Sequence, residues 1–160
     1  GISSYFVPAK YMSVDINPSV MMTINIYNRV INTKPLNDDA EILLSKTDVS
    51  GMSVSESMDE LIKKSEEIGY LNEHNKDVIV EVVDGIGKIK LPDKNYGDVE
   101  VIIENADKAD LKNAKEMGVS IAKARAIAEY TKQNGGSIEE NVHKLENQSV
   151  KEIRRNLENT

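Results

Sequence analysis

The chain has 160 residues, of which 39% are hydrophobic and 29% charged, with a formal net charge of −7 and no cysteine. An acidic chain lacks the basic surface that nucleic-acid binding needs, and a chain without cysteine has no disulfide, no thiol nucleophile and no cysteine-ligated zinc. The length suits one domain with a sizeable core, and no apolar run approaches the ~20 residues of a membrane span.

The first third of the chain predicts a meander of three short strands. In the first of them Val14 and Ile16 face one side, whereas Ser13 and Asp15 face the other. Asn28 is suited to the turn between the second and third strands. The predicted strands are residues 11–16, 21–27 and 29–34.

The rest of the chain predicts helices around two more strands. Ser53 and Glu56 form a capping-box pattern at the start of an amphipathic helix, and Gly69 suits its C-terminal cap. The glycine-containing stretch 84–96 predicts a loop. The predicted helices are about 38–46, 54–68, 111–117, 121–133, one from 137 and one over 149–157, and the strands are 77–83 and 99–103.

This order of elements predicts an α+β fold, with a mostly antiparallel sheet packed by helices in an α/β/α-like sandwich. We expect a domain core over 11–134 and a C-terminal helical extension of the same domain over 135–160.

The stretch SVDINPSV, residues 13–20, is the strongest candidate for chemistry. Asparagine before proline is a common way to start a turn, so the pair could simply end a strand. A chemical reading is also open. Pro18 has no backbone N–H to attack the Asn17 side chain. The remaining route is attack by the Asn17 side-chain nitrogen on its own backbone carbonyl, which expels Pro18 and leaves a C-terminal succinimide.

A fold that holds the Asn17 side chain near attack geometry would accelerate this cleavage. Ser19 is an alternative nucleophile, and Asp15 is a carboxylate that could orient the reaction. The candidate site is therefore the Asn17–Pro18 bond with Ser19 and Asp15 beside it.

Other candidate residues predict no cofactor and no metal site. His74 and His143 are far apart and have no ligand spacing. Gly85 and Gly87 lack the spacing of phosphate-binding loops. The pair Arg154-Arg155 predicts a solvated helix face.

The SVDINPSV run and the following TINIYNRVI resemble the start of the extracytoplasmic (periplasmic) domain of RsgI-like anti-sigma factors of clostridia and bacilli. That domain begins with a similar S-[VL]-D-[IV]-N-P-S segment. The resemblance continues through roughly 11–130, in NDDA at 37–40, the helix and Gly-Tyr pair at 54–70, and AKEMGVSIAKARA at 114–126. Met21-Met22 departs from the family pattern, which prefers an acidic or polar residue before an apolar one.

The resemblance implies one part of a single-pass membrane protein. In such proteins a cytoplasmic segment binds a sigma factor, a membrane helix follows, and the outer domain often precedes a carbohydrate-binding or other sensor module, which implies polysaccharide sensing. The family is associated with autocleavage at Asn-Pro, here Asn17–Pro18, after which the two pieces stay together. Loss of the strand ending at Asn17 would expose a membrane-tethered stub to proteolysis and release the sigma factor. The activity would be a single turnover, and a monomer is expected.

Two alternatives stay open. The same domain could act uncleaved, as a spacer or interaction module. A hydrolase using Asp/Glu catalysis is a third hypothesis, but no acidic pair stands in a recognisable catalytic context. With six Tyr, one Phe and no Trp, the chain also has few aromatic side chains to line a substrate cleft.

Overall fold

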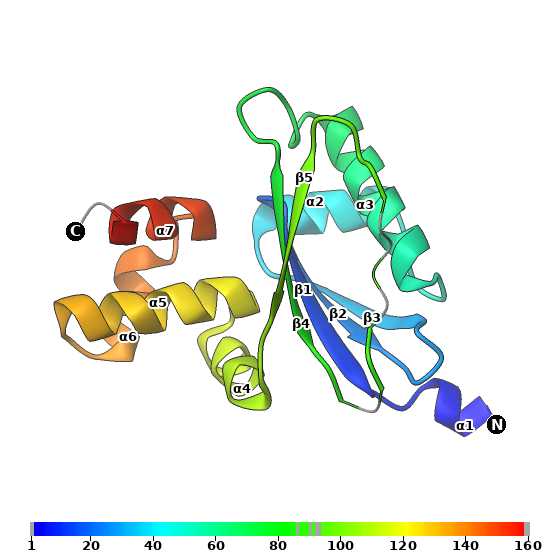
Figure 1. The fold of residues 1–160 in the computed structure, drawn as a ribbon, viewed down its shortest axis with the longest axis horizontal. Helices are drawn as coiled ribbons and strands as arrows, with labels where there is room; N and C mark the ends of the chain where they lie inside the picture. The colour runs from blue at the N-terminus through cyan, green and yellow to red at the C-terminus, as the bar shows by residue number, and fades with distance from the viewer. Residues whose placement is uncertain (1, 86, 90, 92–93, 159–160) are drawn as a thin grey trace.

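A computed structural model of the chain describes residues 2–85, 87–89, 91 and 94–158 (Figure 1). Its centre is a five-stranded sheet in the order β3-β2-β1-β4-β5. The pairs β3-β2, β2-β1 and β1-β4 are antiparallel, whereas β4-β5 is parallel. The mostly antiparallel α+β prediction is therefore confirmed. The strands are β1 (Lys10–Asp15), β2 (Ser19–Ile24), β3 (Val30–Pro35), β4 (Asp77–Val83) and β5 (Glu100–Asn105).

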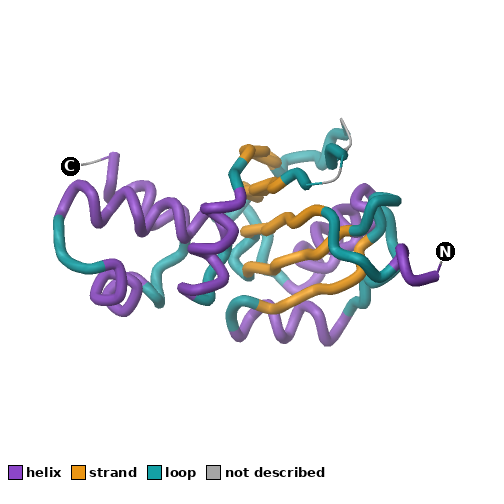
Figure 2. Tube along the Cα trace, turned by 90° about the horizontal axis from the view of Figure 1, so that it is seen from below, coloured by secondary structure: helices purple, strands orange, loops and turns teal. Residues whose placement is uncertain are grey.

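Helices cover both faces of this sheet, as the sandwich prediction requires. One face is covered by α2 (Asp38–Lys46) and α3 (Val54–Ile68). The other is covered by α4 (Lys108–Met117), α5 (Ile121–Asn134), α6 (Ile138–Leu145) and α7 (Val150–Glu158). A short helix, α1 (Ile2–Tyr5), precedes the sheet. The two ends of the chain lie at opposite ends of the molecule (Figures 1 and 2).

Strand β1 is the middle strand and is buried on both faces. Val14 and Ile16, which directly follows the last residue of β1, are fully buried in the core beneath α2 and α3, which confirms the predicted alternation. Ser13 and Asp15 point to the opposite face, and they are also buried, with 0% and 3% of their surface exposed. Helix α5 covers this polar face, and the backbone N–H of Ile121 donates to Ser13 Oγ at 3.2 Å.

Strand β2 begins earlier and ends earlier than predicted. It spans Ser19–Ile24 instead of 21–27, and its pairing with β3 shifts register between Thr23 and Ile24. The chain then turns at Asn25, whose Oδ1 accepts hydrogen bonds from the backbone N–H groups of Tyr27 and Arg29. Asn28 does lie in the turn, with a left-handed φ of 58°. A side chain that closes the turn thus overrides the apolar alternation.

The helix caps follow the sequence closely. The Ser53 side chain accepts from the backbone N–H of Glu56, and Gly69 ends α3 with φ 99°, a conformation that glycine adopts without steric cost. Helix α4 begins three residues before the predicted 111, because Asp107 and Asp110 form a capping box there.

The C-terminal helices share a buried cluster with the sheet. Helices α6 and α7 pack on α5, and Ile79 of β4 joins a cluster that also contains Ile127, Leu145 and Ile153. The division into a core over 11–134 and an extension over 135–160 stays a prediction. Within the part of the chain that the structure describes, none of the helices has the length and apolar character to cross a membrane.

Candidate functional site

Residues 16–18 form a very tight turn between β1 and β2. The last pair of the ladder is Asp15 with Ser19, and beyond it the Ile16 N–H donates to the Pro18 carbonyl at 2.7 Å. Asn17 alone is left at the tip, exposed, with a left-handed φ of 69°. Few residues other than glycine adopt this conformation, and asparagine is among the most tolerant. Ile16 and Pro18 on either side are buried, so the asparagine is held from both sides.

The proline leaves one carbonyl of this turn without its ladder partner. In an ordinary hydrogen-bonded pair the N–H of residue 18 would return a bond to the Ile16 carbonyl, but Pro18 has no N–H to donate. A buried carbonyl needs a partner, and here the side chain of Asn75 supplies it, with Nδ2 2.9 Å from the Ile16 oxygen. The same amide nitrogen donates to the Tyr70 carbonyl at 2.7 Å. Sequence reasoning missed Asn75, although an Asn-Pro turn in a ladder does signal that some distant donor is needed.

Asp15 and Ser19 lie together at the strand ends beside the turn. The Ser19 hydroxyl donates to Asp15 Oδ1 at 2.6 Å. Asp15 Oδ2 is buried and has no hydrogen-bond partner. Burial raises the pKa of Asp15, while the hydrogen bond from Ser19, the nearby Ser120 hydroxyl and the charges of Arg154 and Lys123 oppose the rise. The turn therefore has next to it a carboxyl group that holds its proton more tightly than an exposed aspartate.

An open groove of about 600 Å³ runs past the tip of the turn, where Asn17 and Ser19 line it. Asn37 fixes the turn from this side, because its Oδ1 accepts from the Ser19 N–H at 3.3 Å while it caps α2. The groove leaves the Asn17 side chain in contact with water. Its wall also contains the N-terminal ends of α5 and α7, at Ser120 and Ser149.

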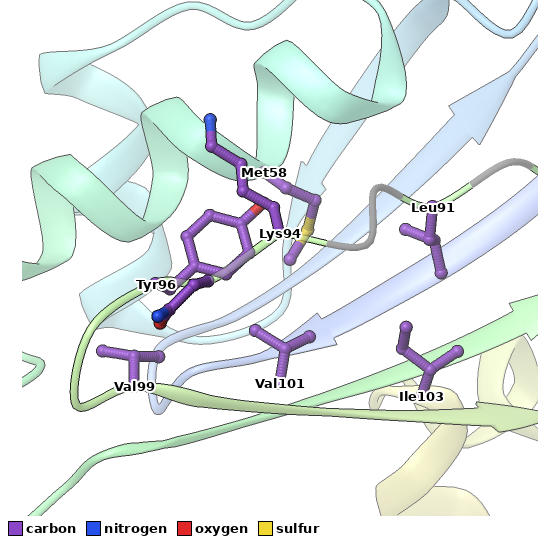
Figure 3. Close-up of a pocket in the computed structure, with 8 residues that line it drawn as sticks. Met58, Leu91, Lys94, Tyr96, Val99, Val101 and Ile103 are labelled. Carbon is purple, nitrogen blue, oxygen red and sulfur yellow. The ribbon is translucent and has the colours of Figure 1, made fainter.

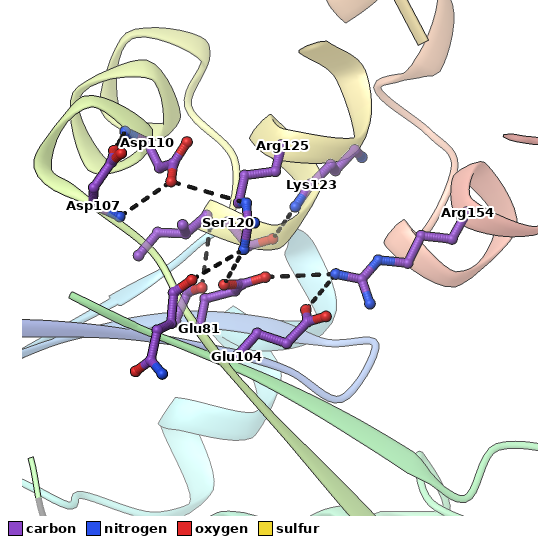
Figure 4. A network of polar contacts seen from close by, with 11 residues as sticks. Glu81, Glu104, Asp107, Asp110, Ser120, Lys123, Arg125 and Arg154 are labelled. Carbon is purple, nitrogen blue, oxygen red and sulfur yellow. Dashed lines mark hydrogen bonds and ion pairs between the residues drawn. The ribbon is translucent and has the colours of Figure 1, made fainter. Parts of the chain in front are cut away.

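An ionic network centred on the buried Glu81 fastens α5 and α7 to the sheet close to this site (Figure 4). The fully buried Glu81 of β4 accepts from Arg125 at 2.9 Å and lies 3.5 Å from Arg154, which also pairs with Glu104. Burial and a hydrogen bond with Glu104 raise the pKa of Glu81 to about 7. Arg154 was predicted on a solvated face, and this was wrong: its side chain is 32% exposed and lies in the network, whereas Arg155 is exposed.

The remaining candidates lie apart from the turn. The side chains of His74 and His143 are 87% and 85% exposed. The described residues contain no group of three acidic, histidine or cysteine side chains that could hold a metal ion. A separate pocket of about 210 Å³ lies between α3 and β5 (Figure 3). Its described lining contains Met58, Leu91, Tyr96 and other side chains but no carboxylate pair.

Sequence comparisons place this arrangement in a family. The anti-sigma factor RsgI-like central domain matches residues 9–129. Anti-sigma-I factor RsgI7 of Acetivibrio thermocellus is 29% identical over 96% of this chain and 31% of its own length. Anti-sigma-I factor RsgI9 of the same organism is 31% identical over 68% of this chain and 14% of its own length. Anti-sigma-I factor RsgI of Bacillus subtilis is 32% identical over 46% of this chain and 19% of its own length.

This chain therefore spans less than a third of the length of each of these relatives. The family match covers all five strands, helices α2 to α4 and most of α5, and it includes the Asn17–Pro18 turn. On this evidence, the chain belongs to the RsgI-like central domain family of anti-sigma factors.

Proposed function

We propose that this domain is an extracytoplasmic signalling module of an anti-sigma factor and that it cleaves itself once, between Asn17 and Pro18. The observation that carries the proposal is the turn itself: one exposed asparagine in a left-handed conformation, held between two buried residues and followed by a proline. Such a turn restrains the side chain and backbone of Asn17 far more than a flexible peptide does, which favours an intramolecular attack.

The reaction needs no outside reagent. Asn17 Nδ2 forms a bond to the Asn17 carbonyl carbon, and the bond from that carbon to the Pro18 nitrogen breaks. One proton leaves Nδ2 and one reaches the Pro18 nitrogen, so the fragments are a succinimide and a new N-terminal proline. We assign the proton transfer to Asp15 acting through Ser19, since the two are hydrogen bonded beside the bond and the pKa of Asp15 is raised.

The fragments would stay together because β1 is the central strand. Antiparallel ladders join it to β2 on one side and to β4 on the other, and its side chains are buried on both faces. Withdrawal of residues up to Asn17 would divide the sheet into two pieces and expose the core. Non-covalent contacts alone would then hold a strand that is costly to remove.

The domain family supports the rest of the proposal. Anti-sigma factors act on sigma factors, so the full-length protein would bind a sigma factor through a segment outside this chain. A sensor module, such as one that binds carbohydrate, would act from the other end. The chain ends lie at opposite ends of the domain, which suits a module through which tension passes (Figure 1). Release of β1 would start proteolysis and free the sigma factor.

The test is the mass of the purified protein after denaturation. We expect two species, one of them beginning at Pro18, whose masses sum to the full chain, or to the full chain plus one water after the succinimide hydrolyses. The matched control is Asn17→Gly, which keeps the left-handed turn and removes the nucleophile. A single full-length species from the unaltered chain would instead favour an uncleaved spacer.

The same measurement separates the two nucleophiles. If Asn17 attacks, Ser19→Ala should still cleave at the same bond, but more slowly because the hydroxyl that passes the proton from Asp15 is lost, and Asn17→Gly should not cleave. Cleavage that persists in Asn17→Gly and is lost in Ser19→Ala would assign the attack to Ser19 and contradict the succinimide route.

A further inference from the structure

The Asn75 side chain that completes the turn is itself held by the last helix of the chain. Asn75 Nδ2 donates to the carbonyls of Ile16 and Tyr70, so its Oδ1 faces the other way. Lys151 Nζ donates to that Oδ1 at 2.5 Å. Both polar atoms of the amide are thus used, and its orientation is fixed by three hydrogen bonds from separate parts of the chain.

Lys151 lies in the first turn of α7 and has little freedom of its own. Its Nζ also donates to the Asp77 carbonyl at the start of β4. Lys151 is partly buried, and this burial lowers the pKa of its ammonium group. Helix α7 is in turn docked by the fully buried Ile153 and by the pairing of Arg154 with Glu81 and Glu104.

We propose that Asn75 and Lys151 are positioning residues for the cleavage, and that through them the docking of α7 controls whether the Asn17–Pro18 turn is competent to react. This inference rests on the proposed self-cleavage. It adds a connection from the C-terminal helix to the scissile turn, through Lys151, Asn75 and the Ile16 carbonyl.

The physical argument concerns the one carbonyl that the strand ladder cannot satisfy. Ile16 immediately precedes the reacting residue, so the plane of its peptide group sets the backbone direction into Asn17. With Asn75 in place, the plane of the peptide group between Ile16 and Asn17 is fixed through its carbonyl. The hydrogen bond from the Ile16 N–H to the Pro18 carbonyl holds the preceding peptide group. Without Asn75, the carbonyl would turn toward water in the groove to regain a partner, and Asn17 would leave its attack geometry.

Undocking of α7 would have different effects before and after cleavage, and both suit a sensor. A load or a bound module that undocks α7 before cleavage would withdraw Lys151, free the Asn75 amide and slow the reaction. Once the bond is cut, the same contacts hold the new end of β1, since the Ile16 carbonyl belongs to the N-terminal fragment. Undocking of α7 would then weaken the hold on that fragment.

The experiment follows cleavage of freshly made protein over time by cell-free synthesis and denaturing mass analysis. Lys151→Met and Asn75→Ala should cleave about ten-fold more slowly or worse than the unaltered chain, in line with the cost of small misplacements in intramolecular reactions. Lys151→Arg keeps a donor and should restore most of the rate. Arg155→Met, an exposed change on the same helix, is the matched control and should cleave normally.

A direct measurement of the hydrogen bond from Asn75 to the Ile16 carbonyl separates a positioning role from general damage to the fold. In the uncleavable Asn17→Gly background, Lys151→Met should move the ¹³C shift of the Ile16 carbonyl, while Arg155→Met should not. A folded Lys151→Met protein that cleaves within two-fold of the unaltered rate would overturn the inference. Failure of the unaltered chain to cleave would overturn the proposed function instead.

Discussion

At the scale of single residues, the site is a problem of unmatched hydrogen-bonding groups. Proline makes the Asn17–Pro18 bond chemically special, and it also removes the donor that the Ile16 carbonyl would meet in an ordinary hairpin. Asn75 satisfies that carbonyl from 59 positions along the chain. The proline that makes self-cleavage at this bond possible thus also leaves the Ile16 carbonyl dependent on a hydrogen-bond donor from a distant part of the chain.

This view predicts that Pro18 and Asn75 are energetically coupled. In the Asn17→Gly background, Asn75→Ala should lower the free energy of unfolding by about 1–3 kcal/mol, because buried carbonyls lose their partner. When Pro18→Ala supplies a backbone N–H at position 18, the same change should cost about 1 kcal/mol less. Urea unfolding of the four proteins gives the coupling, and strict additivity would contradict it.

Some residues of the candidate site could be predicted from one short stretch of sequence, and others could not. Asn17, Pro18, Ser19 and Asp15 were named from one short stretch, and the structure brings all four to the same turn. Asn75 and Lys151 were not named, because nothing near either residue distinguishes it from a surface side chain. Their roles come from register and helix docking, which a single sequence does not specify.

At the scale of elements, the ion pairs of Glu81 decide how firmly α5 and α7 hold the sheet. A glutamate in the middle of a strand would be an anomaly without partners, since burial of an unpaired charge is costly. Arg125 and Arg154 come from two different helices to meet it (Figure 4). The sequence DVIVEVV predicts the strand, but the identity of these partners depends on helix packing.

This network predicts a specific pH dependence of stability. The pKa of Glu81 rises from 4.5 to about 7 on folding, so the folded protein holds a proton that the unfolded chain releases. The contribution of Glu81 to the free energy of unfolding is therefore largest below pH 4.5 and is lost as the pH rises toward 7. The unaltered protein should lose on the order of 2 kcal/mol more than Glu81→Gln between pH 4.5 and pH 8. Urea unfolding at the two pH values measures this, and equal losses would contradict it.

Predictions from pattern succeeded where local chemistry dominates and failed where tertiary contacts do. Caps at Ser53 and Gly69 and the alternation in β1 were correct because they depend on neighbouring residues. The end of β2 was misplaced because the Asn25 side chain closes the turn, and the parallel partner of β4 was not foreseen. Arg154 was assigned to solvent because its acidic partners are 50 and 73 residues away.

At the scale of the whole molecule, cleavage would turn one chain into a complex of two. Residues up to Asn17 include the central strand, so the fragments unfold and dissociate in one process. The midpoint of thermal unfolding of the cleaved protein should therefore rise with protein concentration, whereas that of Asn17→Gly should not. Differential scanning calorimetry over a hundred-fold range of concentration tests this. A midpoint independent of concentration would show that the fragments do not separate on unfolding.

The wide separation of Asn17, Asn75 and Lys151 along the chain has a consequence for biosynthesis. The scissile bond leaves the ribosome early, but the residues that give its turn a reactive shape on our proposal are made later, and Lys151 follows Asn17 by 134 positions. A nascent or truncated chain would lack the completed turn and stay covalently whole. Cleavage would thus occur only in a copy of the domain that has been made and folded through α7. A strand that can be released would be present only in such correctly folded copies.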